Sequence, residues 1–374
     1  MNPTKRKYLY LILIILVASA LRFNHLFDKA PGTDEINSIE NSKNVFAHNF
    51  MLEPPLLGTD LFPPLFYILG NLVINIFYTE NSLKVLMVMF GILSIIAFYF
   101  LVKEIFDTKL AIVAVTLMAF SPMHIIYSQH IRQYMPLIFL YILSVLFLYR
   151  FLFKEDQKSL IYLLITYILS VYLHYFSLLF IGAHFLIVWV FKIRKKIKVK
   201  NYIYVIVATF LALLTLTPLI TKQYVAAQSL QSIPSFKSIY LFYPFYKFSS
   251  MLDFSEILNI ESTILIIPLF INILVIYGFF RSFKQKNKAI FLSLNLLIPI
   301  LSLAIVSIFL QVFSFRYLVF LLPIYLIFLS HSLYSKNFYL RKGLFILIIL
   351  MWLWVIYYYY SNVIFVGWVD KFAL

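Results

Sequence analysis

The 374-residue sequence contains no cysteine, and only 12% of its residues are charged. Without cysteine, the chain cannot form disulfides, thiolate metal sites, iron–sulfur clusters or palmitoylated anchors. Soluble domains carry about 25% charged residues, so this composition excludes a soluble enzyme, a disordered chain and a nucleic-acid module. With 63% apolar residues, a water-soluble fold would leave large apolar patches exposed. The sequence therefore predicts a chain that lies in a lipid bilayer.

The apolar residues occur in long unbroken runs rather than in alternating ten-residue strands, which indicates spanning helices. A span needs about 20 residues. We predict an all-α polytopic fold with about eleven transmembrane helices, forming a single integral membrane domain over residues 1–374. The predicted spans are Tyr8–Leu21, Lys84–Val102, Leu110–Ile126, Met135–Phe153, Ser159–Leu173, Phe176–Phe191, Tyr202–Ile220, Ser262–Phe280, Ala289–Leu310, Tyr317–Tyr334 and Gly343–Tyr360.

A twelfth apolar stretch, Leu61–Tyr78, opens with two prolines and contains two asparagines. If it does not cross and the N-terminus is cytoplasmic, 21 of the 31 basic residues lie in inner loops and 10 lie outside. If it crosses, the ratio is reversed, which the positive-inside rule disfavours. We therefore expect a plasma-membrane protein with a cytoplasmic N-terminus, in which this stretch lies along the outer surface or re-enters it. The N-terminal run also resembles a cleavable signal peptide, although an uncleaved anchor is the usual arrangement.

This arrangement places two long loops outside, at residues 22–83 and 221–261. We expect no soluble domain after the last span, because only 14 residues follow Tyr360. The loop 221–261 would then be the segment that recognises a substrate outside the membrane. Its aromatic residues suggest either an amphipathic segment resting on lipid or one wall of a lipid-donor groove. These residues are Tyr240, Phe242, Tyr243, Phe245, Tyr246 and Phe248.

Ionisable residues gather at the outer ends of four separate segments. Transporters typically carry such groups at mid-membrane on broken helices in corresponding halves, a pattern these spans lack. The grouping on one face instead favours an enzyme acting on a membrane-anchored substrate. The segments are Asp34-Glu35, His124 to Arg132, His174-Tyr175 and Arg316.

At these positions the sequence resembles GT-C glycosyltransferases, in particular the branch of protein O-mannosyltransferases and lipid A aminoarabinose transferases. The resemblance runs from about Arg22 to about Pro323. It departs at Phe62, where many relatives carry His or Lys. The Asp-x-Asp pair and the Trp-Trp-Asp-type motif of oligosaccharyltransferases are also missing, which argues against whole-glycan transfer and against a divalent metal of their kind. The resemblance rests on Leu21-Arg22 with Asp34-Glu35, Pro63-Pro64-Leu65-Phe66-Tyr67, Ser121-Pro122 with His124, Tyr127 to Tyr134, His174-Tyr175-Phe176, and Phe315-Arg316-Tyr317 with Pro323.

The resemblance implies transfer of a sugar, with inversion, from a polyprenyl phosphate to a hydroxyl of a protein, lipid or glycan acceptor, without a cofactor or metal. A carboxylate must take the proton of the hydroxyl as attack begins, and the departing phosphate requires fixed cations. The implied roles are Asp34 as general base, Glu35 as its neighbour that orients the acceptor or tunes the base, Arg132 and Arg316 on the phosphate, and His124, Tyr134, His174 and Tyr175 on substrate.

Simpler interpretations stay open at this point. Asp34-Glu35 is also a plausible solvated helix start, and both arginines could be interfacial side chains that reach toward water. The two histidines could simply pack at helix ends. A glycolipid flippase or other transporter, or a polysaccharide polymerase, would also be a multi-span protein with the bilayer and a lipid-borne substrate as partners.

Overall fold

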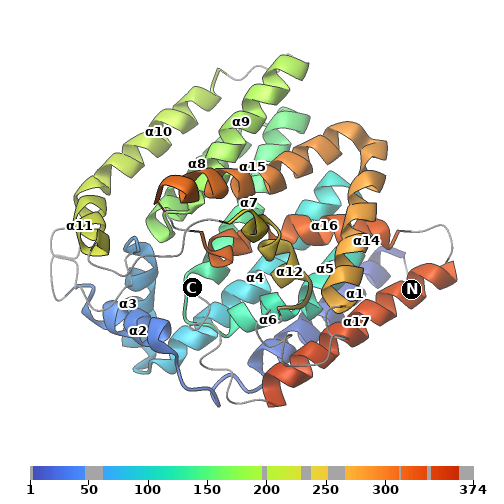
Figure 1. Ribbon diagram of the computed structural model, residues 1–374, viewed down its shortest axis with the longest axis horizontal. Coiled ribbons are helices and arrows are strands. Elements are labelled where there is room, and N and C mark those ends of the chain that lie inside the picture. Colours follow the sequence, from blue (N-terminus) through green and yellow to red (C-terminus); the bar gives the residue numbers. More distant parts are fainter. Residues whose placement is uncertain are drawn as a thin grey trace.

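The computed structural model describes residues 3–46, 62–195, 200–228, 237–251, 266–310, 313–334 and 338–361. Within these ranges every regular element is helical (Figure 1). The elements are α1 (Pro3–Phe23), α2 (Thr33–Asn44), α3 (Leu65–Phe77), α4 (Asn81–Ile105), α5 (Thr108–Phe120), α6 (Pro122–Ser128), α7 (Tyr134–Lys154), α8 (Ser159–Leu173), α9 (Ser177–Lys195), α10 (Tyr202–Thr215), α11 (Thr217–Gln228), η1 (Ser238–Leu241), α12 (Tyr243–Ser250), α14 (Ile266–Ser282), η3 (Phe283–Gln285), α15 (Lys286–Leu310), η4 (Phe315–Leu321), α16 (Leu322–Ser332) and α17 (Phe338–Ser361).

The helices confirm the predicted all-α membrane fold. Five described helices are long and apolar enough to cross a membrane, or up to seven if each of two bent pairs is one span. Each predicted run overlaps one of the helices above, and several of these helices have fewer than 18 residues. The count of eleven spans therefore stays a prediction.

Prolines explain the two bent pairs. The axes of α5 and α6 differ by 58°, and those of α10 and α11 by 52°. Ser121, directly before Pro122, has an extended backbone (φ −61°, ψ 119°), because the proline ring disfavours a helical residue before it. The second break is at Leu216, two residues before Pro218. Each proline lies in the first turn of the second helix, where its missing N–H is tolerated.

The stretch that we predicted to lie along the outer surface forms α3, which has 13 residues. A helix of this length is about 20 Å long, which is too short for a hydrocarbon core of about 30 Å. It packs closely on α2, because a Cβ atom on Gly70 would lie 2.4 Å from Oγ of Ser42. The side chain of Asn71 also donates to the backbone carbonyl of Ser42 (2.9 Å). The two short helices therefore form one unit at the edge of the bundle (Figure 1).

A hydrogen-bonded group of polar side chains joins α7, α8, α9, α10 and α15 in the interior. His184 Nε2 donates to Oδ1 of Asn295 (2.8 Å), and its Nδ1 accepts from the hydroxyl of Tyr167 (2.9 Å). That hydroxyl also lies 3.3 Å from the hydroxyl of Tyr202, and Tyr141 donates to the carbonyl of Asn295 (3.1 Å). Both imidazole nitrogens are satisfied, so these residues hold helices together as polar contacts do in membranes.

The centre of the bundle is α16, whose side chains are almost all buried and which lies between α14, α15 and α5 in Figure 1. Gly278 of α14 faces its backbone so closely that a Cβ atom would lie 1.9 Å from the carbonyl oxygen of Phe328. By contrast, a Cβ atom on Gly182 of α9 would meet no atom within 4 Å. Small residues at such crossings allow two backbones to approach.

We therefore expect Gly278→Ala to destabilise the bundle by about 1–3 kcal/mol, the usual cost of overpacking. Gly182→Ala is the matched control and should be neutral or slightly stabilising, because alanine favours helix. Thermal unfolding of the detergent-purified proteins measures both. Equal melting temperatures for the two variants would contradict the close crossing of α14 and α16.

Candidate active site

The first turn of α2 presents Asp34 and Glu35 at one end of the bundle. The helix follows a Pro31-Gly32 pair, and Gly32 has an extended backbone (φ −74°, ψ 173°). The N–H of Gly32 donates to Oε2 of Glu35 (3.1 Å), which closes the helix start as in a capping box. Acidic residues are also favoured here by the helix dipole. The local sequence thus explains why the two carboxylates lie at this point.

Glu35 and Arg132 clamp α2 onto the turn between α6 and α7. Glu35 Oε1 accepts from the backbone N–H of Ile131 (2.8 Å). In return, Arg132 Nη1 donates to the backbone carbonyl of Asp34 (3.0 Å) and to the hydroxyl of Ser38 (3.0 Å). Glu35 and Arg132 are both buried, at 7% and 4% exposed. Their charges are therefore engaged in positioning α2.

Asp34 forms an ion pair with Arg316, which lies 282 residues later in the chain. Oδ2 of Asp34 is 3.1 Å from Nη1 of Arg316, and the two side chains are 28% and 6% exposed. Nε and Nη2 of Arg316 are buried and have no hydrogen-bond partner within the described part of the chain. Nη1 of the guanidinium therefore holds the carboxylate, and the donors on Nε and Nη2 are unused among the described residues.

His174 adds a neutral hydrogen-bond donor beside these groups. Burial and the nearby charge of Arg132 lower its pKa to about 3, so the ring is uncharged at neutral pH. Because Nδ1 accepts from the N–H of Phe176 (3.1 Å), the ring proton lies on Nε2. Among the described residues, Nε2 has no hydrogen-bond partner.

Aromatic rings surround His174. The ring centroids of Phe62, Tyr134 and Tyr317 lie 4.9, 5.9 and 5.9 Å from that of its imidazole. Phe62, the position at which the sequence departs from many relatives, also lies under the guanidinium of Arg132 (5.1 Å). This residue therefore supplies aromatic contact where those relatives have a polar side chain.

The structure does not bring all the predicted site residues together. His124 is fully buried and accepts from Arg22 Nη2 through Nδ1 (2.7 Å), while its Nε2 donates to Oγ of Ser94 (2.8 Å). Neither ring nitrogen is available to a substrate in this geometry. Tyr175 donates to Oε1 of Gln223 (2.6 Å), whose amide nitrogen donates to the carbonyl of Phe62 (3.2 Å). Burial raises the pKa of Tyr175, so it is a neutral hydroxyl that joins two loops.

Sequence reasoning assigned no role to three polar residues in this region. Tyr127 lies within electrostatic range of its guanidinium, and the hydroxyl of Tyr127 and both amide atoms of Gln133 are buried without a partner among the described residues. Both lie in the segment that already contained Arg132 and Tyr134, so its dense polar content was the available signal. Lys247 is only 3% exposed and packs over the rings of Tyr243 and Phe315 (5.4 and 5.3 Å).

Lys247 belongs to α12, part of the loop that we interpreted as resting on lipid or lining a donor groove. Within α12 the side chain of Phe248 is fully buried, whereas Phe242 just before it is exposed. The helix thus packs into the bundle beside η4, and the surface-segment interpretation does not hold for Lys247–Ser250. Residues 229–236 and 252–261 of that loop lie outside the described residues.

Comparison with known proteins agrees with this geometry. Residues 62–221 match the family model described as dolichyl-phosphate-mannose-protein mannosyltransferase. The structure is similar to apo ArnT from Cupriavidus metallidurans, with a TM-score of 0.65 and 12% identity over 90% of this chain and 62% of that one. The structure of ArnT from the same organism bound to undecaprenyl phosphate is also similar, with a TM-score of 0.63, 12% identity and the same coverage of both chains.

A third similar structure is the Archaeoglobus fulgidus oligosaccharyltransferase tethered to an acceptor peptide. Its TM-score is 0.60, with 15% identity over 95% of this chain and 55% of that one. The chain therefore shares the fold of the ArnT and oligosaccharyltransferase structures. The chain spans less than two thirds of the length of these structures, and no curated protein matches its sequence.

The neutral state of His174 has a consequence for stability. Its folded pKa, about 3, lies below the ordinary value of about 6.5, so the unfolded chain binds a proton that the folded chain does not. Between pH 6.5 and pH 3 the stability should therefore fall as the pH falls. From pH 7 to pH 5 we expect a loss of about 2 kcal/mol from this group.

The measurement compares the fall in melting temperature between pH 7 and pH 5 for the parental protein and for His174→Gln. The variant should show a smaller fall, because other groups titrate equally in both proteins. Parallel curves would mean that His174 is not buried as a neutral ring.

Proposed function

We propose that this chain is a GT-C glycosyltransferase that moves a sugar from a polyprenyl phosphate to an acceptor hydroxyl. The observation that carries the proposal is the pairing of Asp34 with Arg316, in which a partly exposed carboxylate meets a buried guanidinium that retains two open nitrogens. A base for the acceptor and a cation for the leaving phosphate are thus adjacent. These are the two groups that this transfer requires.

The comparisons support the substrate class. The ArnT structure of the same fold holds undecaprenyl phosphate, and the matched family model is that of mannosyltransferases using dolichyl phosphate mannose. The matched region, residues 62–221, contains Arg132 and His174. On that basis we infer that this chain also uses a sugar donor linked to a lipid phosphate. The acceptor is a hydroxyl of a protein, lipid or glycan.

Asp34 acts as the general base in this proposal. Its carboxylate takes the proton of the acceptor hydroxyl while the hydroxyl oxygen attacks the anomeric carbon, on the side opposite to the phosphate. The new glycosidic bond forms as the bond from carbon to phosphate oxygen breaks, so the configuration inverts and polyprenyl phosphate leaves. Glu35 cannot share this role easily, because both of its oxygens already accept backbone hydrogen bonds.

Arg316 stabilises the leaving phosphate. Its charge is fixed, and a guanidinium can donate two parallel hydrogen bonds to phosphate oxygens. The open Nε and Nη2 lie on one edge of the group, as such a bidentate contact requires. Nε2–H of His174 can add a neutral donor to the phosphate or sugar. Arg132 acts mainly through its hold on α2.

The site faces the outer side of the membrane in our proposal. The inner loops would then hold 21 of the 31 basic residues, as the positive-inside rule requires. Asp34, Arg132 and Arg316 come together in the structure, so a single orientation applies to all three.

Replacement of Asp34 by Asn keeps the shape of the side chain and removes the base. We expect sugar transfer from a labelled polyprenyl-phosphate sugar to fall by about 10²–10⁴-fold in membranes that contain equal amounts of protein. Glu40→Gln is the matched control, since it removes one negative charge from the exposed side of the same helix and should keep parental activity.

Parental activity of Asp34→Asn would contradict its role as base. The product also separates the alternatives. Lipid translocation into vesicles without a covalent product would favour a flippase, and long chains rather than single transferred sugars would favour a polymerase.

Replacement of Arg316 tests the phosphate contact. We expect Arg316→Gln to weaken binding of undecaprenyl phosphate by about tenfold or more, because hydrogen bonds to charged groups contribute about 1.5–3 kcal/mol. Arg316→Lys should recover only part of the loss, since an ammonium keeps the charge but lacks the planar fork. Native mass spectrometry of the purified protein with the lipid measures both. Unchanged binding in Arg316→Gln would place the phosphate elsewhere.

A further inference from the structure

A groove lies at the end of the bundle opposite to the candidate active site. Its volume is about 600 Å³, and it is lined by residues of α1, α5 and α17 and by Leu333 and Tyr334, which follow α16. α1, α5 and α17 are joined at their other ends, where Arg22 donates to carbonyls at the end of α5 (3.0 and 3.3 Å) and Tyr360 donates to the carbonyl of Leu21. Gln129, close to the turn that holds Glu35, also donates to the carbonyl of Arg22 (3.0 Å). The groove therefore belongs to the other membrane face.

The walls of the groove have two chemical parts. Along α5 and α17 they are apolar, with Ile112, Val113, Phe345 and Ile346 as examples. The hydroxyl of Thr116 on the same wall donates to the backbone carbonyl of Ile112 in its own helix (2.8 Å). Its donor is therefore satisfied without a ligand. The volume lies within the range of about 300–1,000 Å³ that is common for ligand sites.

The second part is a cationic rim at the helix starts. It consists of Lys109 at the start of α5 and the adjacent pair Arg341 and Lys342 in the first turn of α17. None of the residues that line the groove is acidic. An occupant of the groove would therefore meet an apolar trough and a positively charged mouth.

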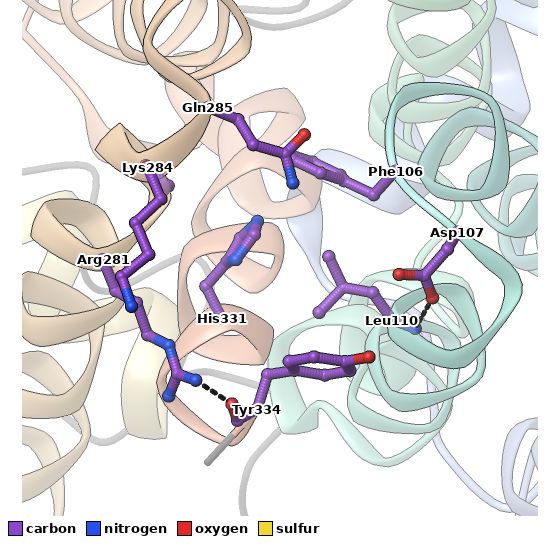
Figure 2. Close-up of a pocket in the computed structure, with 9 residues that line it drawn as sticks. Phe106, Asp107, Leu110, Arg281, Lys284, Gln285, His331 and Tyr334 are labelled. Carbon is purple, nitrogen blue, oxygen red and sulfur yellow. Dashed lines mark hydrogen bonds between the residues drawn. The ribbon is translucent and has the colours of Figure 1, made fainter. Parts of the chain in front are cut away.

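A neighbouring cavity adds further positive charge beside the groove. Tyr334 lines both spaces, and the cavity, of about 230 Å³, has Arg281 and Lys284 on one side and Asp107 on the other (Figure 2). Asp107 keeps its negative charge, and its Oδ1 accepts from the backbone N–H groups of Lys109 and Leu110 (2.7 and 2.9 Å) and so caps α5. It lines the neighbouring cavity and not the groove. The face around the groove is thus predominantly positive.

We propose that this groove binds an anionic phospholipid, with the phosphate at Lys109, Arg341 and Lys342 and one acyl chain along the apolar wall of α5 and α17. The geometry joins the two requirements of that ligand in one continuous space. Basic pockets between membrane helices recognise anionic headgroups in this way, whereas a zwitterionic lipid brings no net charge to the rim. The site is separate from the transferase chemistry and does not depend on it.

The test measures lipid binding to the full-length protein by native mass spectrometry, with phosphatidylglycerol and phosphatidylcholine of identical chains. We expect a clear preference for phosphatidylglycerol in the parental protein. Arg341→Gln with Lys342→Gln should weaken its binding by about thirtyfold, from roughly fivefold per cation near the membrane surface. Lys158→Gln with Lys200→Gln, which removes the same charge beside α8 and α10, is the matched control and should keep parental binding.

Val113→Trp tests the acyl wall, because the indole would fill the trough without changing charge. It should weaken binding of phosphatidylglycerol while the protein keeps parental secondary structure by circular dichroism. Glycerol phosphate, which has no chains, should not displace the lipid at equal concentration. Equal binding of the two lipids by the parental protein, an equal loss in the control pair, full binding by Val113→Trp, or displacement by glycerol phosphate would each overturn the proposal.

Discussion

The reciprocal clamp between the first turn of α2 and the turn before α7 determines the geometry of the candidate site. Glu35 accepts a backbone N–H from the second segment, and Arg132 of the second segment donates to a backbone carbonyl of the first. Each buried charge is therefore compensated by polar groups of the other chain segment, as burial of charge requires. The two bonds therefore help to fix the start of α2, and with it the position of Asp34 relative to Arg316.

The clamp also divides the work between similar residues. Glu35 and Arg132 are buried and engaged with the backbone, whereas Asp34 is 28% exposed and Arg316 keeps two nitrogens open. The fixed start of α2 holds the partly exposed carboxylate of Asp34 beside the buried guanidinium of Arg316 through a single contact. Preorganisation of this kind lets charged groups act on a transition state without first rearranging. In this proposal, the catalytic pair depends on the positioning pair.

The sequence was sufficient for the helices because the bilayer imposes length and apolar composition on each span. It did not reveal the breaks at Ser121 and Leu216, since hydropathy does not register where a proline interrupts hydrogen bonding. The gathering of the charged segments at one site could be inferred from their position at span ends, and the structure brings Asp34, Arg132 and Arg316 together. The sequence could not show that Glu35 is bound by backbone while Asp34 pairs with an arginine. This difference depends on contacts with residues about 100 and 282 positions away. The buried Lys247 was missed for the same reason.

Three histidines are fully buried among the described residues, and their hydrogen bonds distinguish structural residues from site residues. In sequence they are equivalent, each lying in or at the end of an apolar run. His124 and His184 have partners on both ring nitrogens. They therefore join helices and have no ring nitrogen left to bind a substrate. His174 uses Nδ1 for the turn at Phe176 and leaves Nε2 unpartnered among the described residues, close to Arg132. A buried donor without a partner costs free energy, and a ligand that accepts its hydrogen bond recovers that cost. Nε and Nη2 of Arg316 are buried donors without a partner among the described residues as well. A phosphate bound there would accept their hydrogen bonds and recover the same cost.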